Sequence, residues 1–204
     1  MKTVKTILLA SMCALFAIAT NAQKVIVESG NLSVLAGSKS IKLEYNYDNL
    51  AVGKKYTDDK KYVADKKAEA KDPEKAAAFE KGWYGARTER YEPKFEELFN
   101  KTLEKPGVIS SKTVADSKYT IIVKTVKIEP GFNIGVAKQP SFVDFKFIVY
   151  ETGNPNKVVA VANLFNVVGS QYMGYDFDAG SRIAESYAKA GKEFGNYLAK
   201  KVFK

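Results

Sequence analysis

Three consecutive segments between residues 118 and 168 constrain the fold more than any other feature of the chain. They read KYTIIVKTVKI, SFVDFKFIVY and KVVAVANLFNVV, and all three are rich in the β-branched and aromatic residues typical of strands. The second segment alternates between apolar and polar residues, which is the period of a half-buried strand. We therefore expect one side of it to face a hydrophobic core, through Val143, Phe145, Phe147 and Val149.

The connections between these segments predict how they pair. The sequence ETGNPNK, between the second and third segments, consists of turn-forming residues and predicts a β-hairpin. In the first segment, both alternating sets of residues are partly apolar. This pattern predicts either a central strand or a β-bulge near Thr125.

The remaining elements complete an α+β pattern. Residues 24–29 and 41–47 are predicted to be strands, and residues 181–200 a final helix. A helix after Arg90 carries Tyr91, Phe95, Leu98, Phe99 and Thr102 on one face, and the final helix carries Ile183, Tyr187, Ala190, Phe194 and Leu198. We predict a two-layer α+β sandwich, with a mainly antiparallel sheet and the helices on one face.

The segment 54–84 differs from its surroundings, because it mixes charges of both signs with alanine and has few large apolar residues. Asp72 followed by Pro73 is typical of a helix start, as a cap followed by proline in the first turn. We expect two exposed helices or a partly mobile charged helical appendage. It would belong to a single α+β domain that spans residues 23–204, rather than form a second domain.

The first residues of the chain predict export. Residues 1–22 combine a short basic start, an uncharged and mostly apolar run, and an ending in the small residue Ala22. This is the pattern of a secretory signal peptide, and its apolar run is short for a transmembrane span. We predict a mature chain that begins at Gln23 and is secreted to the periplasm or the outer envelope.

The sequence lacks the residue types that most catalytic and metal sites need. It has no histidine, and its one cysteine, Cys13, lies inside the apolar run of the predicted signal, where it does not fit a lipid-modified position. Histidine-dependent triads, thiol chemistry and the usual zinc sites are therefore excluded, and we expect no cofactor and no metal. Of the basic residues only Arg87, Arg90 and Arg182 are arginine, so we expect no nucleic-acid partner.

The stretch GYDFDAGSRIAESYAKAG, residues 174–191, raises the question of an ion-binding loop. Counted from Asp176, the loop lacks the ligands that an EF-hand requires at its fifth and twelfth positions and the glycine at its sixth, where Gly180, Tyr187 and Ser181 stand. Asp178 or Ser181 instead fits the start of the last helix, where a side-chain oxygen accepts from free backbone N–H groups. We interpret the stretch as a helix start.

Two aromatic clusters are the candidate partner-binding surfaces. The stretch GWYGARTERY joins aromatic and arginine side chains, which are enriched at binding hot spots; Gly82 and Gly85 are expected to interrupt the helix and place the aromatics on a turn. The loop QYMGYDF is the second cluster. Packing into the core is the competing interpretation. The candidates are Trp83, Tyr84, Arg87, Arg90, Tyr172, Met173, Tyr175 and Phe177.

Five motifs carry a resemblance to known families: the helix YEPKFEELFNKTLEK, the strand start ADSKYTIIV, the loop EPGFNIG, the corner YETG and the glycine-led last helix. From Tyr91 to Lys204 the chain resembles uncharacterised small secreted Gram-negative proteins. It also resembles the α+β amino-terminal domain of the Tol-system propeller protein and related envelope lipoproteins. The resemblance implies a periplasmic or outer-envelope accessory protein and no particular activity.

Two functions remain after these exclusions. The first is a secreted, non-enzymatic module that binds or assembles with an envelope protein or glycan. The alternative is a carboxylate-dependent enzyme that acts on glycans, which would need paired acids in a concave pocket.

Overall fold

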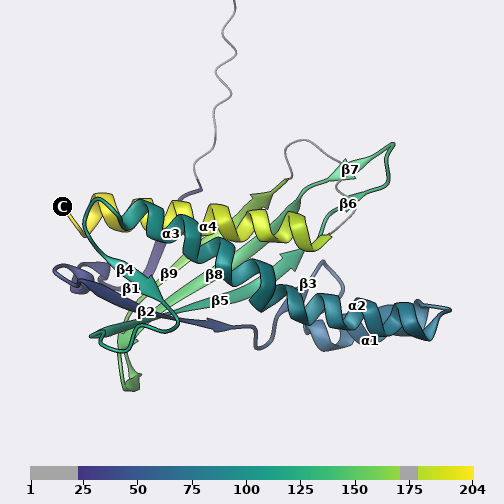
Figure 1. The fold of residues 1–204 in the computed structure, drawn as a ribbon, viewed down its shortest axis with the longest axis horizontal. Coiled ribbons are helices and arrows are strands. Elements are labelled where there is room, and N and C mark those ends of the chain that lie inside the picture. The colour runs from purple at the N-terminus through teal and green to yellow at the C-terminus, as the bar shows by residue number, and fades with distance from the viewer. Residues whose placement is uncertain (1–22, 171–178) are drawn as a thin grey trace, which may run out of the picture.

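The computed structural model describes residues 23–170 and 179–204, and it has a mixed α/β architecture (Figure 1). An open, mainly antiparallel sheet forms the centre, and helices pack against it. The antiparallel sheet and the mixture of helices and strands that the sequence predicted are confirmed.

The sheet has the strand order β1-β9-β8-β5-β2-β4. The long pairings β1–β9, β9–β8 and β8–β5 are antiparallel, whereas β2 runs parallel to both β5 and β4. The short strand β3 also pairs with β5 in parallel. The strands are β1 (Ile26–Gly30), β2 (Ser40–Asn46), β3 (Ala51–Val52), β4 (Ile109–Ser111), β5 (Tyr119–Glu129), β8 (Ser141–Glu151) and β9 (Asn154–Gly169).

The expected β8–β9 hairpin is present, and both alternatives for the first of the three segments hold. Strand β5 lies between β8 and β2, so it is central, and its register with β8 shifts between Thr125 and Lys127. A separate small hairpin, made of β6 (Phe132–Asn133) and β7 (Lys138–Gln139), extends from this end of the sheet (Figure 1).

Helix α2 begins where the sequence predicted, but it continues through the glycines at which the sequence predicted a break. The Asp72 side chain accepts from the backbone N–H of Glu74 at 2.8 Å, so the predicted cap of α2 is confirmed. The predicted interruption at Gly82 and Gly85 is wrong. The helices are η1 (Leu32–Leu35), α1 (Asp59–Glu69), α2 (Pro73–Ala86), the π-helical turn η2 (Arg87–Tyr91), α3 (Glu92–Leu103) and α4 (Ala179–Lys201).

The hydrophobic core lies between the sheet and the pair of helices α3 and α4. The four β8 residues expected in the core are fully buried, as are the five predicted on α4. The Phe194 ring of α4 stacks on Phe147 of β8 with ring centroids 3.9 Å apart. Tyr187 meets Phe145 edge-on at 4.8 Å, and Phe95 of α3 also contacts Phe147. The apolar residues that alternate along β8 therefore lie on the face of the sheet that α3 and α4 cover.

Glycine allows α3 and α4 to approach each other closely. A Cβ atom at Gly191 would lie 2.3 Å from the backbone oxygen of Phe95, and one at Gly195 would overlap Thr102 Oγ1. Both glycines are buried at this contact. The absence of a side chain at these positions thus sets the spacing of the two helices.

Candidate functional site

The site begins with the long helical segment that runs from α2 through η2 into α3. Between Arg87 and Tyr91 the backbone adopts a π-helical turn rather than ending. Such turns insert one extra residue into a helix and are frequent at functional sites. A lone helical glycine weakens a helix by only about 1 kcal/mol, so packing overrides it here. Along this segment Trp83 and Tyr91 are buried, whereas Glu89 and Arg90 are exposed.

Trp83 and Arg87 point inward, onto a buried carboxylate. The Trp83 indole Nε1 donates to Asp59 Oδ2 at 3.0 Å, and the Arg87 guanidinium forms an ion pair with the same oxygen. Asp59 is only 3% exposed and Trp83 only 8%. The guanidinium also lies over the rings of Tyr47 and Tyr84, at 4.4 and 4.9 Å from their centroids. These contacts join the start of α1 to the end of α2.

The exposed turn predicted for Trp83 is therefore wrong, whereas a partner-binding role for this residue stays a prediction. Its side chain is part of the interior, and it sits on a helix, not on a turn. Tyr84 is half-buried beside Arg87, which is held by Asp59. Arg90 is the exposed member of the set. The second cluster, Tyr172, Met173, Tyr175 and Phe177, lies outside the described residues, as do Asp176 and Asp178.

A second buried polar network follows at the start of α3. The Tyr47 hydroxyl donates to Glu92 Oε1 at 3.3 Å, and the Lys112 ammonium pairs with Glu92 Oε2 at 2.5 Å. One turn later, the Tyr45 hydroxyl donates to Glu96 Oε1 at 3.2 Å. These pairs tie strand β2 and the loop after β4 to α3.

Burial sets the protonation of this network. Desolvation raises the pKa of the Glu96 carboxyl above its ordinary value, against the hydrogen bond from Tyr45, which lowers it. Desolvation likewise raises the pKa values of Tyr45, Tyr47 and Tyr187 well above the usual tyrosine range. The three phenols stay neutral at physiological pH, and those of Tyr45 and Tyr47 donate hydrogen bonds to the two carboxylates. Among the described residues, Gln23 Oε1 is the only buried side-chain polar atom without a partner.

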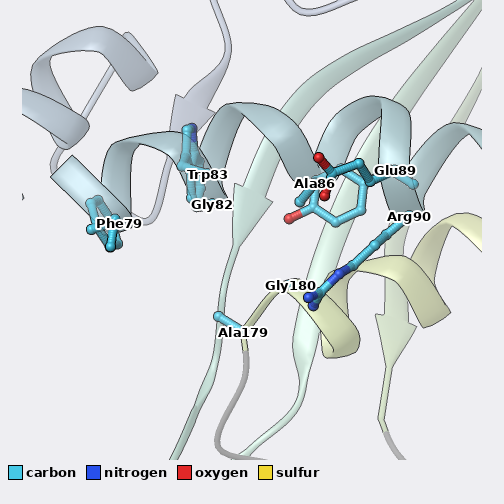
Figure 2. Close-up of a pocket in the computed structure, with 10 residues that line it drawn as sticks. Phe79, Gly82, Trp83, Ala86, Glu89, Arg90, Ala179 and Gly180 are labelled. Atoms are coloured by element: carbon cyan, nitrogen blue, oxygen red, sulfur yellow. The ribbon is translucent and has the colours of Figure 1, made fainter. Parts of the chain in front are cut away.

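On the outer side of the same helical segment, a cleft opens between α2 and the beginning of α4. This α2–α4 cleft has a volume of about 250 Å³. Figure 2 shows the Arg90 side chain extending from its helix toward the first turn of α4, near Gly180. The lining residues are Ala78, Phe79, Gly82, Trp83, Ala86, Glu89, Arg90, Tyr91, Ala179 and Gly180.

A second cleft adjoins the first and shares Glu89 and Arg90 with it. This α3–α4 cleft has a volume of about 310 Å³ and continues along the groove between the two helices. Its lining is more strongly charged and contains three carboxylates and two cations. The residues are Glu89, Arg90, Pro93, Lys94, Glu97, Ser181, Ala184 and Glu185.

The two clefts form a site with a mostly apolar floor at one end and charges of both signs at the other. Gly82 presents no side chain at the wall, and a Cβ atom added there would meet nothing within 4 Å. Within residues 23–170 and 179–204, no group of three or more acidic, histidine or cysteine side chains is placed to hold a metal ion. The arrangement suits recognition of a ligand with both apolar and polar surface.

Sequence reasoning found two residues of this site, Trp83 and Arg90, and missed the others. Arg90 was a candidate and lines both clefts, whereas Glu89 and Glu97 were not singled out. Their acidic residue type on a charged helix carries no signal, since most such residues are simply solvated. The spacing of Phe79, Trp83 and Ala86 was the missed signal, because steps of four and three residues indicate one face of a continuous helix.

Comparisons with known proteins define no family for this chain. No protein-family model matches it, and no curated protein matches it. Among solved structures, it is similar to a PelC L103M dodecamer from Paraburkholderia phytofirmans, with 16% identity, a TM-score of 0.36, and coverage of 81% of this chain and 95% of that one. A second PelC dodecamer from the same organism has 14% identity, a TM-score of 0.39, and coverage of 85% and 97%. Likeness at this level assigns neither a function nor an assembly to the chain.

No helix among the described residues is long and apolar enough to cross a lipid bilayer.

Proposed function

We propose that this protein is a secreted or periplasmic, non-enzymatic module that binds a partner in the cell envelope through the paired clefts beside α4. The observation that carries the proposal is the shared rim of the two clefts, where exposed Arg90 and Glu89 stand over an apolar floor. A π-helical turn at this point, in a helix otherwise fixed by buried contacts, supports it.

The proposal also covers the export of the protein and the two-layer arrangement of its domain. Residues 1–22 would direct secretion, and the mature protein would begin at Gln23 without a lipid. The domain would be a two-layer sandwich, with the α3–α4 pair forming the layer that covers one face of the sheet. Both helices contribute to the clefts, so the layer that closes the core also presents the binding surface.

The buried polar groups support binding rather than catalysis. Asp59 is occupied by Trp83 and Arg87, and Glu92 by Tyr47 and Lys112. Catalytic acids need access to substrate as well as a perturbed pKa. Glu96 has the raised pKa, yet it is not among the residues that line either cleft.

The lining suggests the chemistry of the partner. Phe79 offers aromatic surface, while Arg90 and Lys94 lie together with Glu89 and Glu97 along the groove. Mixed charges disfavour a strongly anionic or cationic ligand. A neutral glycan chain, or a protein segment with both apolar and polar side chains, would match this surface.

Site-specific photo-crosslinking in the expressing bacterium tests the proposal. A photo-reactive amino acid at Ala78 or Lys94, in the two clefts, should give a covalent adduct with the partner. Matched positions at Ala64 of α1 and Lys101 of α3 are exposed but line neither cleft, and they should give none. Arg90→Glu should abolish the adducts while the protein stays folded, which circular dichroism checks. Equal crosslinking at all four positions would contradict the proposal.

The α3–α4 cleft also supports the alternative of a carboxylate-dependent enzyme that acts on glycans. Glu89, Glu97 and Glu185 all line it, and a pair of carboxylates is what glycoside hydrolysis requires. Purified protein would be incubated with peptidoglycan, and the soluble fragments would be followed by mass spectrometry. Release of fragments that is lost in Glu89→Gln, Glu97→Gln or Glu185→Gln would favour the enzyme. Absence of release from the wild type would leave the binding module as the function.

A further inference from the structure

The β6–β7 hairpin exposes apolar side chains at the end of a projection. It stands out from the end of the sheet near α4 (Figure 1). Phe132 is 43% exposed, Ile134 65% and Val136 95%. Large apolar side chains that are exposed together on a projection mark an interaction surface, whereas single exposed ones need no explanation.

Hydrogen bonds hold this tip in a defined shape. The Ile134 backbone N–H donates to the Ala137 oxygen at 3.0 Å, and the Gly135 N–H donates to Asn133 Oδ1 at 3.0 Å. Gly135 has φ +82°, a left-handed conformation that glycine adopts without strain. The tip therefore presents Ile134 and Val136 outward as part of a turn, not as a frayed chain.

The base of the hairpin is fixed to the body of the protein. Arg182 Nε of α4 donates to the backbone oxygen of Pro130 at 3.2 Å. Ser141 Oγ, just after β7, donates to the backbone oxygen of Arg182 at 2.9 Å. Gly131 lies so close to Gln139 and Pro140 that a Cβ atom there would meet the Gln139 oxygen at 2.3 Å. The projection is thus attached at both of its strands.

The segment that forms the tip carries a single charge, and that charge is positive. Between Glu129 and Asp144 the sequence has no acidic residue, and Lys138 is the only charged side chain. The whole chain carries a formal net charge of +9. An anionic membrane surface attracts each nearby lysine by about 1 kcal/mol, and exposed aliphatic and aromatic side chains beside it suit the interface.

We propose that the β6–β7 tip inserts into the interface of a lipid bilayer that carries anionic headgroups. Phe132, Ile134 and Val136 would enter the boundary between headgroups and acyl chains, and Lys138 would stay among the headgroups. A stable protein interface buries about 800 Å² on each partner, which three side chains on a narrow projection do not supply. A bilayer deforms around a small tip and needs no complementary pocket. None of these residues lines either cleft, so the tip is separate from the site described above.

Vesicle partitioning of matched variants tests the proposal. The protein is purified as the expressing bacterium processes it, so that all variants share one N-terminus, and is floated with vesicles of phosphatidylcholine containing phosphatidylglycerol. Ile134→Ser with Val136→Ser should reduce partitioning about tenfold or more. Ile109→Ser with Val158→Ser removes side chains that are 66% and 49% exposed elsewhere, and it should leave partitioning unchanged. Lys138→Gln should reduce it about fivefold.

Each outcome decides the proposal. It fails if the wild type does not float, or if the tip variant floats as well as the wild type, since binding would then come from other lysines. It also fails if the tip variant changes the mass measured by analytical ultracentrifugation but not the flotation, because the tip would then contact a second copy. A complementary variant, Val136→Trp, should bind more tightly and be quenched by brominated lipid; bound protein without this quenching would place the tip outside the bilayer.

Discussion

The α3–α4 pair and the α1–α2 hairpin are both helical, but different kinds of contact hold their helices in place. The α3–α4 pair is held by apolar packing, in which Phe194 stacks on Phe147 and glycines bring the helices together. The α1–α2 hairpin buries few large side chains and is held by the Asp59–Arg87 ion pair with Trp83. Apolar contacts stabilise in proportion to the area buried, whereas a buried charge depends on its one partner.

The largest expected effect comes from Phe194→Ala in the apolar region. Removal of a fully buried ring leaves a cavity beside Phe147 and should lower the free energy of unfolding by about 3–5 kcal/mol. Lys192→Ala, at an exposed position of the same helix, is the control. Urea unfolding of both variants measures the difference. A loss below about 1 kcal/mol would mean that the core around Phe147 refills.

Asp59→Ala should have the next largest effect, of about 2–4 kcal/mol, because it leaves Arg87 partly buried without its counter-ion. The loss should be local: hydrogen exchange should accelerate over residues 59–86 and stay slow in β8. Asp65→Ala, which removes a partly exposed carboxylate of the same helix that pairs with Lys61 and Lys55, should cost less than about 1 kcal/mol. Uniform acceleration across the whole sheet would show that the two regions unfold together.

Glycine-to-alanine substitutions should have opposite signs in the two regions. Gly191→Ala places a Cβ atom against the Phe95 backbone and should destabilise by about 1–3 kcal/mol. Gly82→Ala meets open space in α2 and should stabilise by about 0.5–1 kcal/mol. Thermal unfolding of both variants gives the comparison. Stabilisation by Gly191→Ala would show that α3 and α4 can separate at no cost.

Loss of the cap of α2 should be smaller. Asp72→Ala removes an acceptor for the backbone N–H groups of Glu74 and Lys75 and should cost about 1 kcal/mol. Lys71→Ala, at the exposed preceding position, is the control. Circular dichroism during urea unfolding would detect the change. Equal stability of the two variants would show that the hairpin does not depend on its cap.

The smallest effect concerns pH. The pKa of Glu96 is raised above its ordinary value of 4.5, so the folded state binds this proton more tightly than the unfolded state. The associated stability is present below pH 4.5 and is lost as the pH rises through the folded-state pKa. Glu96→Gln should therefore unfold at higher denaturant than the wild type at pH 7, and this advantage should shrink toward pH 4. An advantage that does not vary with pH would exclude Glu96 titration as its source.

The candidate site shows where pattern reasoning succeeds and where it stops. Arg90 was selected for its residue type and lies on the rim of both clefts. Trp83 was selected on the same grounds and is buried, because helical continuity through Gly82 and Gly85 turns its ring toward Asp59. Residue type predicts a capacity for binding, but the direction of a side chain depends on the helix that carries it and on what that helix packs against.

The sequence by itself determined the features that repeat with a short period. Alternation along β8 predicted that Phe145 and Phe147 lie in the core, and spacing along α4 predicted the same for Tyr187 and Phe194. Asp72 predicted the start of α2. Each of these predictions depends only on a residue and its near neighbours in the sequence. Only the tertiary structure decided the parallel pairing of β2 with β5, the contact of Asp59 with Arg87, and the clefts where the π-helical turn faces the start of α4. These join residues that are distant in the chain. Which residues meet depends on how whole helices and strands pack and on which buried charges pair with an opposite charge. No local sequence pattern encodes these contacts.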